Sequence, residues 1–203
     1  MPKYNVFESV NMGSTKYAER IFDAVATVDI ENGTFGYLDN LVDGESVIYN
    51  FVAGTKAGEQ VVVVDNPAWS EDTCRIINQR KDKYIIPAGT PFRVRVVKKN
   101  DEFGTAIEGI TSSTQSIVTN ITDFTANKVY LTIDADTGKL VASTTDTTST
   151  TDTTDTTDTT DATDVVMKAR IMRKRIQGNT LVTGIRSYGY TRNIYEAKVI
   201  TLA

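Results

Sequence analysis

Residues 84–99, YIIPAGTPFRVRVVKK, limit the fold of this chain more than any other stretch. From residue 92 onward, apolar side chains alternate with mostly charged ones: Phe92, Arg93, Val94, Arg95, Val96 and Val97. A period of two is typical of a half-buried β-strand. Pro87 fixes φ and Gly89 permits a positive φ, so the preceding turn is specified locally. The stretch predicts a structural β-hairpin and contains no nucleophile, base or phosphate-binding loop.

Turn residues divide the first half of the chain into short strands. Asn32-Gly33 separates residues 25–30 from residues 34–38, and Asn-Gly between such runs predicts a hairpin. Asp43-Gly44 marks a second turn. Residues 61–64 are a continuous valine run bounded by turn residues, which predicts a strand buried on both faces.

The rest of the chain predicts more strands and few helices. Short strands are expected around residues 103–110, 129–133, 139–142, 165–176, 180–185 and 195–202. The best helix candidate is residues 69–80, with Ser70 as its N-cap. Residues 14–22 are compatible with a short helix and equally with an extended arm.

These patterns predict a mainly β fold: a small β-barrel or sandwich with one short helix, an N-terminal arm and a disordered acidic Thr/Asp loop. The expected division is an arm over residues 1–20, the first part of the β domain over 21–142, the loop over 143–164, and strands completing the body over 165–203.

The Thr/Asp tract of residues 143–164 contains six aspartates and no basic residue. The whole chain carries a net charge of −4, so the remainder without those aspartates carries +2. The tract has three interpretations: a solvated loop, a modified Thr-rich stalk, and a row of regularly spaced aspartates that binds metal ions. A solvated loop is favoured, because the tract has no large apolar residue with which to offset the cost of ordering.

The composition excludes several kinds of chemistry. Histidine is absent, which excludes a Ser-His-Asp triad and His-ligated zinc or haem. Cys74 is the only cysteine, so no intrachain disulfide forms, and a buried thiol is favoured over a reactive one. No apolar run is long enough for a membrane helix, and the first 17 residues lack the apolar region of a signal peptide. The sequence therefore predicts a chain that is made and used in a cytosol, or that leaves it by a route such as assembly and lysis.

Three patterns each leave two interpretations open. Asp134, Asp136 and Gly138 resemble the start of a calcium loop, but the later ligand positions do not fit, so a hairpin turn is favoured. Residues 165–176 form a basic strand face that suits an anionic surface, although a solvated face is favoured. Residues 186–193 are rich in Tyr and Arg, which fits either an interface or ordinary loop packing.

The order of motifs resembles a family of small structural proteins of tailed phages, encoded beside the major capsid protein. The resemblance covers residues 30–110 and, more weakly, 128–203. The matching positions are Gly36, Asp43-Gly44, residues 61–64, Ala88-Gly89-Thr90-Pro91-Phe92-Arg93 and Phe103. The Thr/Asp tract and the first 20 residues depart from the family pattern.

The resemblance implies a virion structural protein that decorates or stabilises the capsid head, located on the capsid surface and assembled in the bacterial cytoplasm. The implied partners are the major capsid protein and further copies of the chain, and a trimer would suit the threefold positions of a capsid. Neither a membrane nor a nucleic acid is expected as a partner. No enzyme activity, catalytic residue, cofactor or metal is expected. The alternatives are a fibre or adhesion module that binds host surface glycans, and a carboxylate-based hydrolase.

The expected capsid contacts lie in two stretches, the N-terminal arm and the loop at residues 188–192. Aromatic and arginine side chains are common interface anchors. The candidate interface residues are Tyr4, Phe7, Tyr17, Tyr188, Tyr190 and Arg192.

Overall fold

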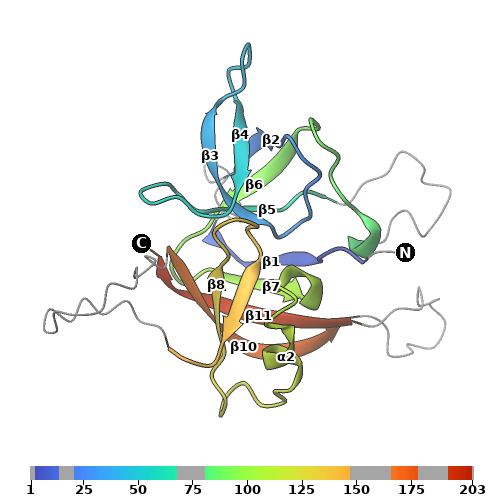
Figure 1. Ribbon diagram of the computed structural model, residues 1–203, viewed down its shortest axis with the longest axis vertical. Helices are drawn as coiled ribbons and strands as arrows, with labels where there is room; N and C mark the ends of the chain where they lie inside the picture. The colour runs from blue at the N-terminus through green and yellow to red at the C-terminus, as the bar shows by residue number, and fades with distance from the viewer. Residues whose placement is uncertain (1–2, 14–20, 68–80, 147–165, 178–191, 203) are drawn as a thin grey trace, which may run out of the picture.

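A computed structural model describes residues 3–13, 21–67, 81–146, 166–177 and 192–202. These residues form a closed five-stranded barrel packed against a six-stranded sheet (Figure 1). The expected mainly β fold is confirmed. The helix at residues 69–80 that we expected lies outside the described residues, and within them the one α-helix is the short α2, Gln115–Thr119.

The barrel is built from consecutive strands in the first half of the chain: β2 Ile21–Val25, β3 Phe35–Leu41, β4 Ile48–Ala53, β5 Val62–Val64 and β6 Phe92–Val96. Their order around the barrel is β2-β4-β3-β5-β6. The β2–β4 pair is parallel, and the other four pairs are antiparallel.

The sheet combines strands from both ends of the chain: β1 Phe7–Asn11, β7 Glu102–Ala106, β8 Tyr130–Ile133, β9 Leu140–Ser143, β10 Met167–Gln177 and β11 Arg192–Leu202. Its order is β1-β7-β11-β10-β8-β9, and all its pairs are antiparallel. Two 3₁₀ turns, η3 Lys81–Lys83 and η4 Ile107–Gly109, accompany the strands.

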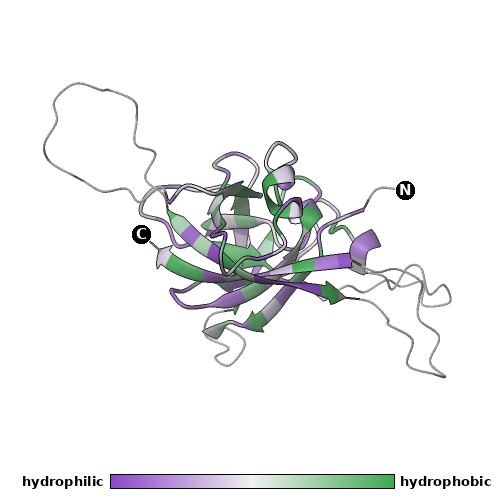
Figure 2. Cartoon of the chain, turned by 90° about the horizontal axis from the view of Figure 1, so that it is seen from below, coloured by the Kyte–Doolittle hydropathy of each residue, from purple (hydrophilic) through white to green (hydrophobic). Residues whose placement is uncertain are grey.

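Strand β5 lies between two hydrophobic cores. Val62 and Val64 point into the barrel, while Val61 and Val63 pack into a second core shared with the sheet. The prediction that residues 61–64 are buried on both faces is confirmed. Along other strands, apolar and polar residues alternate, as Figure 2 shows. Because Val61 and Val63 contribute to the core of the sheet, the barrel and the sheet pack against each other through one shared core, while the barrel keeps a second core of its own.

The β8–β9 hairpin attaches the sheet to the barrel through backbone contacts. The Phe35 amide donates to the Gly138 carbonyl at 2.9 Å, and the Thr55 amide donates to the Ala135 carbonyl at 3.3 Å. A Cβ on Gly54 would lie 1.9 Å from the Ala135 carbonyl oxygen. Glycine at this contact allows the two backbones to approach each other.

The sequence predicts some hairpins correctly and others wrongly. Asp43-Gly44 does connect two paired strands, β3 and β4. Asn32-Gly33 forms a turn, but the flanking strands β2 and β3 are not paired with each other. Strand β6 likewise does not form a hairpin with residues 85–86, because its partners are β2 and β5. Turn residues fix a local reversal, whereas barrel closure decides which strands become neighbours.

The prediction of an arm over residues 1–20 is wrong for residues 7–11. They form strand β1 and pair with β7. The physical reason is the burial of an apolar side chain: the ring of Phe7 packs against the rings of Phe35 and Phe103 in the core. Residues 14–20 lie outside the described residues, and residue 21 already begins strand β2.

Candidate functional site

The first candidate site is a junction around Arg192, the first residue of β11. Its Nη2 lies 3.6 Å from the Asp82 carboxylate and 3.8 Å from that of Glu108. The Arg192 side chain is 8% exposed, and that of Asp82 is 1% exposed. Charges this deeply buried are stable only when they are paired.

The N-terminal segment joins this junction through its backbone. The amide of Tyr4 donates to the Asp82 carbonyl at 3.0 Å, and the Tyr4 carbonyl accepts from Arg192 Nη1 at 3.5 Å. Tyr4 and Arg192 therefore lie side by side, although 188 positions separate them in sequence. The junction connects the N-terminal segment, η3, η4 and β11.

The six predicted interface residues have different positions. Tyr4 is half-buried beside Arg192. Phe7 is only 5% exposed within the shared core, so the prediction that its side chain contacts a partner is wrong. Arg192 points into its ion cluster rather than outward, because two carboxylates surround its guanidinium group. Tyr17, Tyr188 and Tyr190 lie outside the described residues, as does Cys74.

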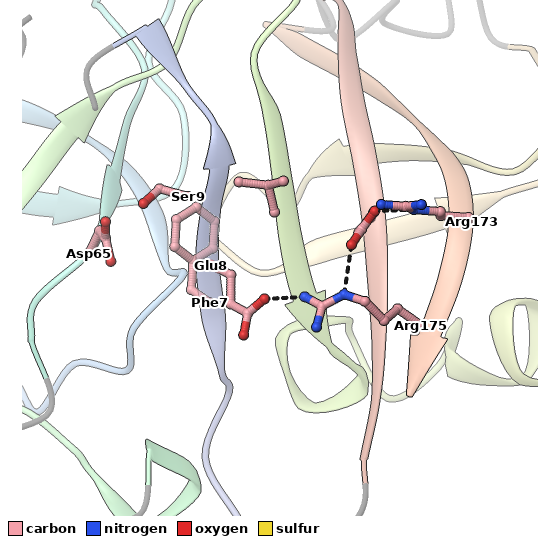
Figure 3. A pocket seen from close by; sticks show the side chains of 8 residues that line it. Phe7, Glu8, Ser9, Asp65, Arg173 and Arg175 are labelled. Carbon is pink, nitrogen blue, oxygen red and sulfur yellow. Dashed lines mark hydrogen bonds and ion pairs between the residues drawn. The ribbon is translucent and has the colours of Figure 1, made fainter. Parts of the chain in front are cut away.

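The second candidate site is an open groove of about 520 Å³ between the edge of the sheet and the barrel. Figure 3 shows Glu8 and Arg175 pointing toward each other in this groove. The lining residues are Phe7, Glu8, Ser9, Val10, Asp65, Arg173, Arg175 and Glu196. Sequence reasoning did not bring these charged residues together, since they come from four separate strands or loops.

A row of charges crosses the floor of the groove. Arg175 forms ion pairs with both Glu8 and Glu196, and Arg173 pairs with Glu196. Burial raises the pKa of the Glu196 carboxyl, but the hydrogen bonds from Arg173 and Arg175 outweigh it, so its pKa is lowered overall. A hydrogen bond to Glu196 raises the pKa of Arg175.

Strand β10 reaches the groove because it contains an irregularity. Ile171 pairs with Ala197, but the register shifts before Arg173, which pairs with Glu196. Met167, Ala169 and Ile171 face the core, and without the shift Arg173 and Arg175 would continue on that face. The bulge therefore places the two arginines on the outer face, where they meet the carboxylates.

The arrangement of the groove suits a structural role. The carboxylates and guanidinium groups of the row neutralise one another, and the hydrogen-bonded Glu196 is not a general acid with a raised pKa. The basic strand that we expected over residues 165–176 is thus partly engaged by acidic neighbours. Lys168 at its start is buried and pairs with Asp146, which lies in the Thr/Asp tract and is the last described residue before residue 147.

Residues 134–138 form the hairpin turn between β8 and β9 that we favoured over a calcium loop. Asp134 Oδ1 accepts hydrogen bonds from the amides of Asp136 and Thr137 and from the Thr137 hydroxyl. The Thr137 side-chain hydrogen bond is the main reason why the pKa of Asp134 is lowered. Within the described ranges, no group of three or more Asp, Glu, Cys or His is arranged to hold a metal ion.

Comparison with known proteins gives no family assignment. No protein-family model, curated protein or solved structure matches this chain. Among the helices that the structure describes, none has the length and apolar character needed to span a bilayer.

Proposed function

We propose that this protein is a structural component of a tailed-phage virion that binds the capsid surface and decorates or stabilises the head, without catalysing a reaction. The observation that carries the proposal is the meeting of Tyr4 and Arg192. We expect capsid contacts in two stretches, the N-terminal arm and residues 188–192, and Tyr4 of the first stretch meets Arg192 of the second at this junction.

The buried ion cluster is suited to anchoring a contact surface. Asp82 and Arg192 are fixed by burial and by each other, so the segments attached to them leave the body at defined points. A contact that starts from a fixed point loses less conformational entropy on binding than one on a free arm. Tyr4 and Arg192 would then belong to one contact surface rather than two.

The shared core fits the role of a rigid structural protein. Barrel and sheet are joined by Phe7, Phe35 and Phe103, whose rings contact one another. A body of this kind keeps its shape by hydrophobic packing without a disulfide, as a protein assembled in a bacterial cytoplasm requires. The proposed partners are the major capsid protein and further copies of this chain.

Co-sedimentation and cryo-electron microscopy of the protein with capsids of its parent particle test the proposal. We expect ordered density on the capsid lattice, with the Tyr4 and Arg192 end of the molecule facing the shell. Deleting residues 1–20 is not a suitable variant, because it would remove strand β1. The double variant Tyr188→Ala, Tyr190→Ala substitutes no residue of the described body and should lose capsid binding.

A matched control is Val28→Ser, a change at an exposed barrel residue, which should leave binding intact. Wild-type protein that does not sediment with capsids would contradict the proposal. Binding to host surface glycans on an array, together with absence from the capsid, would favour an adhesion module instead.

A further inference from the structure

Two exposed surfaces of this chain complement each other. Both lie outside the junction, and the second shares Arg173 and Arg175 with the groove. The first is the tip of the β3–β4 hairpin, which projects from the barrel (Figure 1). Strand β3 pairs with β5 only at Phe35 and Gly36, and β4 pairs with β2 only over residues 48–50, so residues 42–47 extend past the paired strands of the barrel. At its tip, Leu41 is 41% exposed and Val47 is 62% exposed.

The hairpin tip is acidic as well as apolar. Residues 37–52 contain Asp39, Asp43 and Glu45 and no Lys or Arg. All three carboxylates lie on exposed residues. A partner for this surface therefore needs an apolar contact surrounded by positive charge.

The second surface is the end of β10, residues 172–177. Strand β8 pairs with β10 only as far as Arg170, followed by one bond from the Ile171 amide to the Val129 carbonyl. Beyond that point β11 is the only strand, among those described, that pairs with β10. An edge of this kind leaves backbone donors and acceptors open to another chain.

This strand end has the opposite charge and its own apolar contacts. Met172 is 47% exposed and Ile176 is 69% exposed. Among the described residues, Arg173 and Arg175 form ion pairs with Glu8 and Glu196, so these four charges balance and Lys174 adds one positive charge. Lys174 is exposed and forms no ion pair with a described residue.

We propose that copies of this chain associate head to tail, with the β3–β4 hairpin tip of one copy docked on residues 172–177 of the next. The two surfaces lie toward opposite ends of the long axis of the molecule (Figure 1), so one chain does not satisfy both by itself. The hairpin tip has a net negative charge and the β10 end has a net positive charge from Lys174, so neither surface is electrostatically complementary to a copy of itself. The contact is therefore heterologous, and repeated contacts form a closed ring or an open filament.

This inference does not depend on the capsid role, because neither surface includes Tyr4 or Arg192. The test is sedimentation velocity of the full chain over a wide range of protein concentrations, at low and at high salt. We expect species larger than the monomer as concentration rises, and weaker association at high salt because exposed charges are screened.

Two substitutions each block one surface. Val47→Asn removes the most exposed apolar contact of the hairpin tip without adding a charge, and Ile176→Glu replaces the most exposed apolar contact of β10 with a charge that the acidic tip repels. We expect each to weaken association about tenfold or more, as for central interface residues. Both side chains are exposed, so the fold should persist. Val28→Glu is the matched control: Val28 is 60% exposed and lies outside both surfaces, so association should be unchanged.

The decisive experiment mixes the two blocked variants. Val47→Asn retains a working β10 surface and Ile176→Glu retains a working hairpin, so the mixture should form a heterodimer while each variant alone stays monomeric. A charge exchange gives a second readout: Glu45→Lys and Lys174→Glu should each weaken association, and the double variant should restore it. A wild-type chain that is monomeric at every concentration, blocked variants that still associate, or a mixture without heterodimer would each overturn the proposal.

Discussion

The carboxylate of Glu8 on β1 and the guanidinium group of Arg175 on β10 form an ion pair across the two strands that lie between them, β7 and β11. Neighbouring strands are about 4.8 Å apart, so the pair spans about 14 Å of sheet. Gly104 on β7 pairs with both Glu8 and Glu196. Because glycine has no side chain, nothing at position 104 stands between the charged side chains of the two neighbouring strands. The outer face of the sheet is thus tied together by charges from three strands.

The first prediction concerns the space above Gly104. A Cβ at position 104 would lie 2.8 Å from Ile194 Cγ2 and 3.6 Å from Glu8 Cβ. Gly104→Ala should therefore lower the free energy of unfolding by about 1–3 kcal/mol, the usual cost of overpacking. Denaturant unfolding measures it. In an Ile194→Ala background the cost of Gly104→Ala should shrink, because the clashing methyl group is gone; equal costs in both backgrounds would refute the explanation.

The second prediction concerns pH. Because the pKa of Glu196 is lower in the folded chain than in the unfolded chain, the unfolded chain takes up the proton first as pH falls. The stabilisation by Glu196 is therefore complete above the ordinary carboxyl pKa of about 4.3 and is lost as pH falls through the lower folded pKa. Unfolding free energies measured across this range should fall with pH.

The variant Glu196→Gln should flatten that dependence and cost about 1–3 kcal/mol at neutral pH, the range for hydrogen bonds to charged groups. Glu102→Gln is the control, since Glu102 and Lys198 form an exposed pair at 3.7 Å that should contribute little. An identical pH profile for Glu196→Gln and wild type would show that the row does not stabilise the fold.

The third prediction separates backbone strain from steric clash at the hairpin that joins sheet and barrel. Gly54 and Gly58 both have positive φ, 102° and 81°, but only Gly54 contacts another backbone. Gly58→Ala should cost about 1 kcal/mol from strain alone. Gly54→Ala should cost clearly more, because its Cβ would overlap the Ala135 carbonyl. Thermal unfolding compares the two, and equal effects would mean that this contact does not hold the units together.

The fourth prediction concerns the Thr/Asp tract. Lys168 and Asp146 form an ion pair beside the two points at which residues 147–165 leave and rejoin the described body. Replacing those residues with a short Gly-Ser linker should change the free energy of unfolding by no more than about 0.5 kcal/mol. Circular dichroism with denaturant unfolding measures this. A shortened chain that fails to fold would show that the tract belongs to the body.

The candidate sites were less predictable from sequence than the strands. Tyr4 and Arg192 were both singled out as interface residues, yet no sequence pattern indicated that they meet, because the contact depends on the burial of Asp82. The groove was missed for a similar reason. Glu8 and Glu196 are isolated acidic residues in sequence, and only the order of the strands brings them to Arg175.

What the sequence determined by itself was local. The alternation in residues 92–96, the valine run of residues 61–64 and the Asp43-Gly44 hairpin are present in the structure, because side-chain period and turn chemistry act between near neighbours. Tertiary structure decided the rest. It placed Phe7 in the core, paired β2 with β4 rather than β3, and turned Arg173 and Arg175 outward at a bulge. Those outcomes depend on barrel closure and on burial shared between distant segments, which no local pattern encodes.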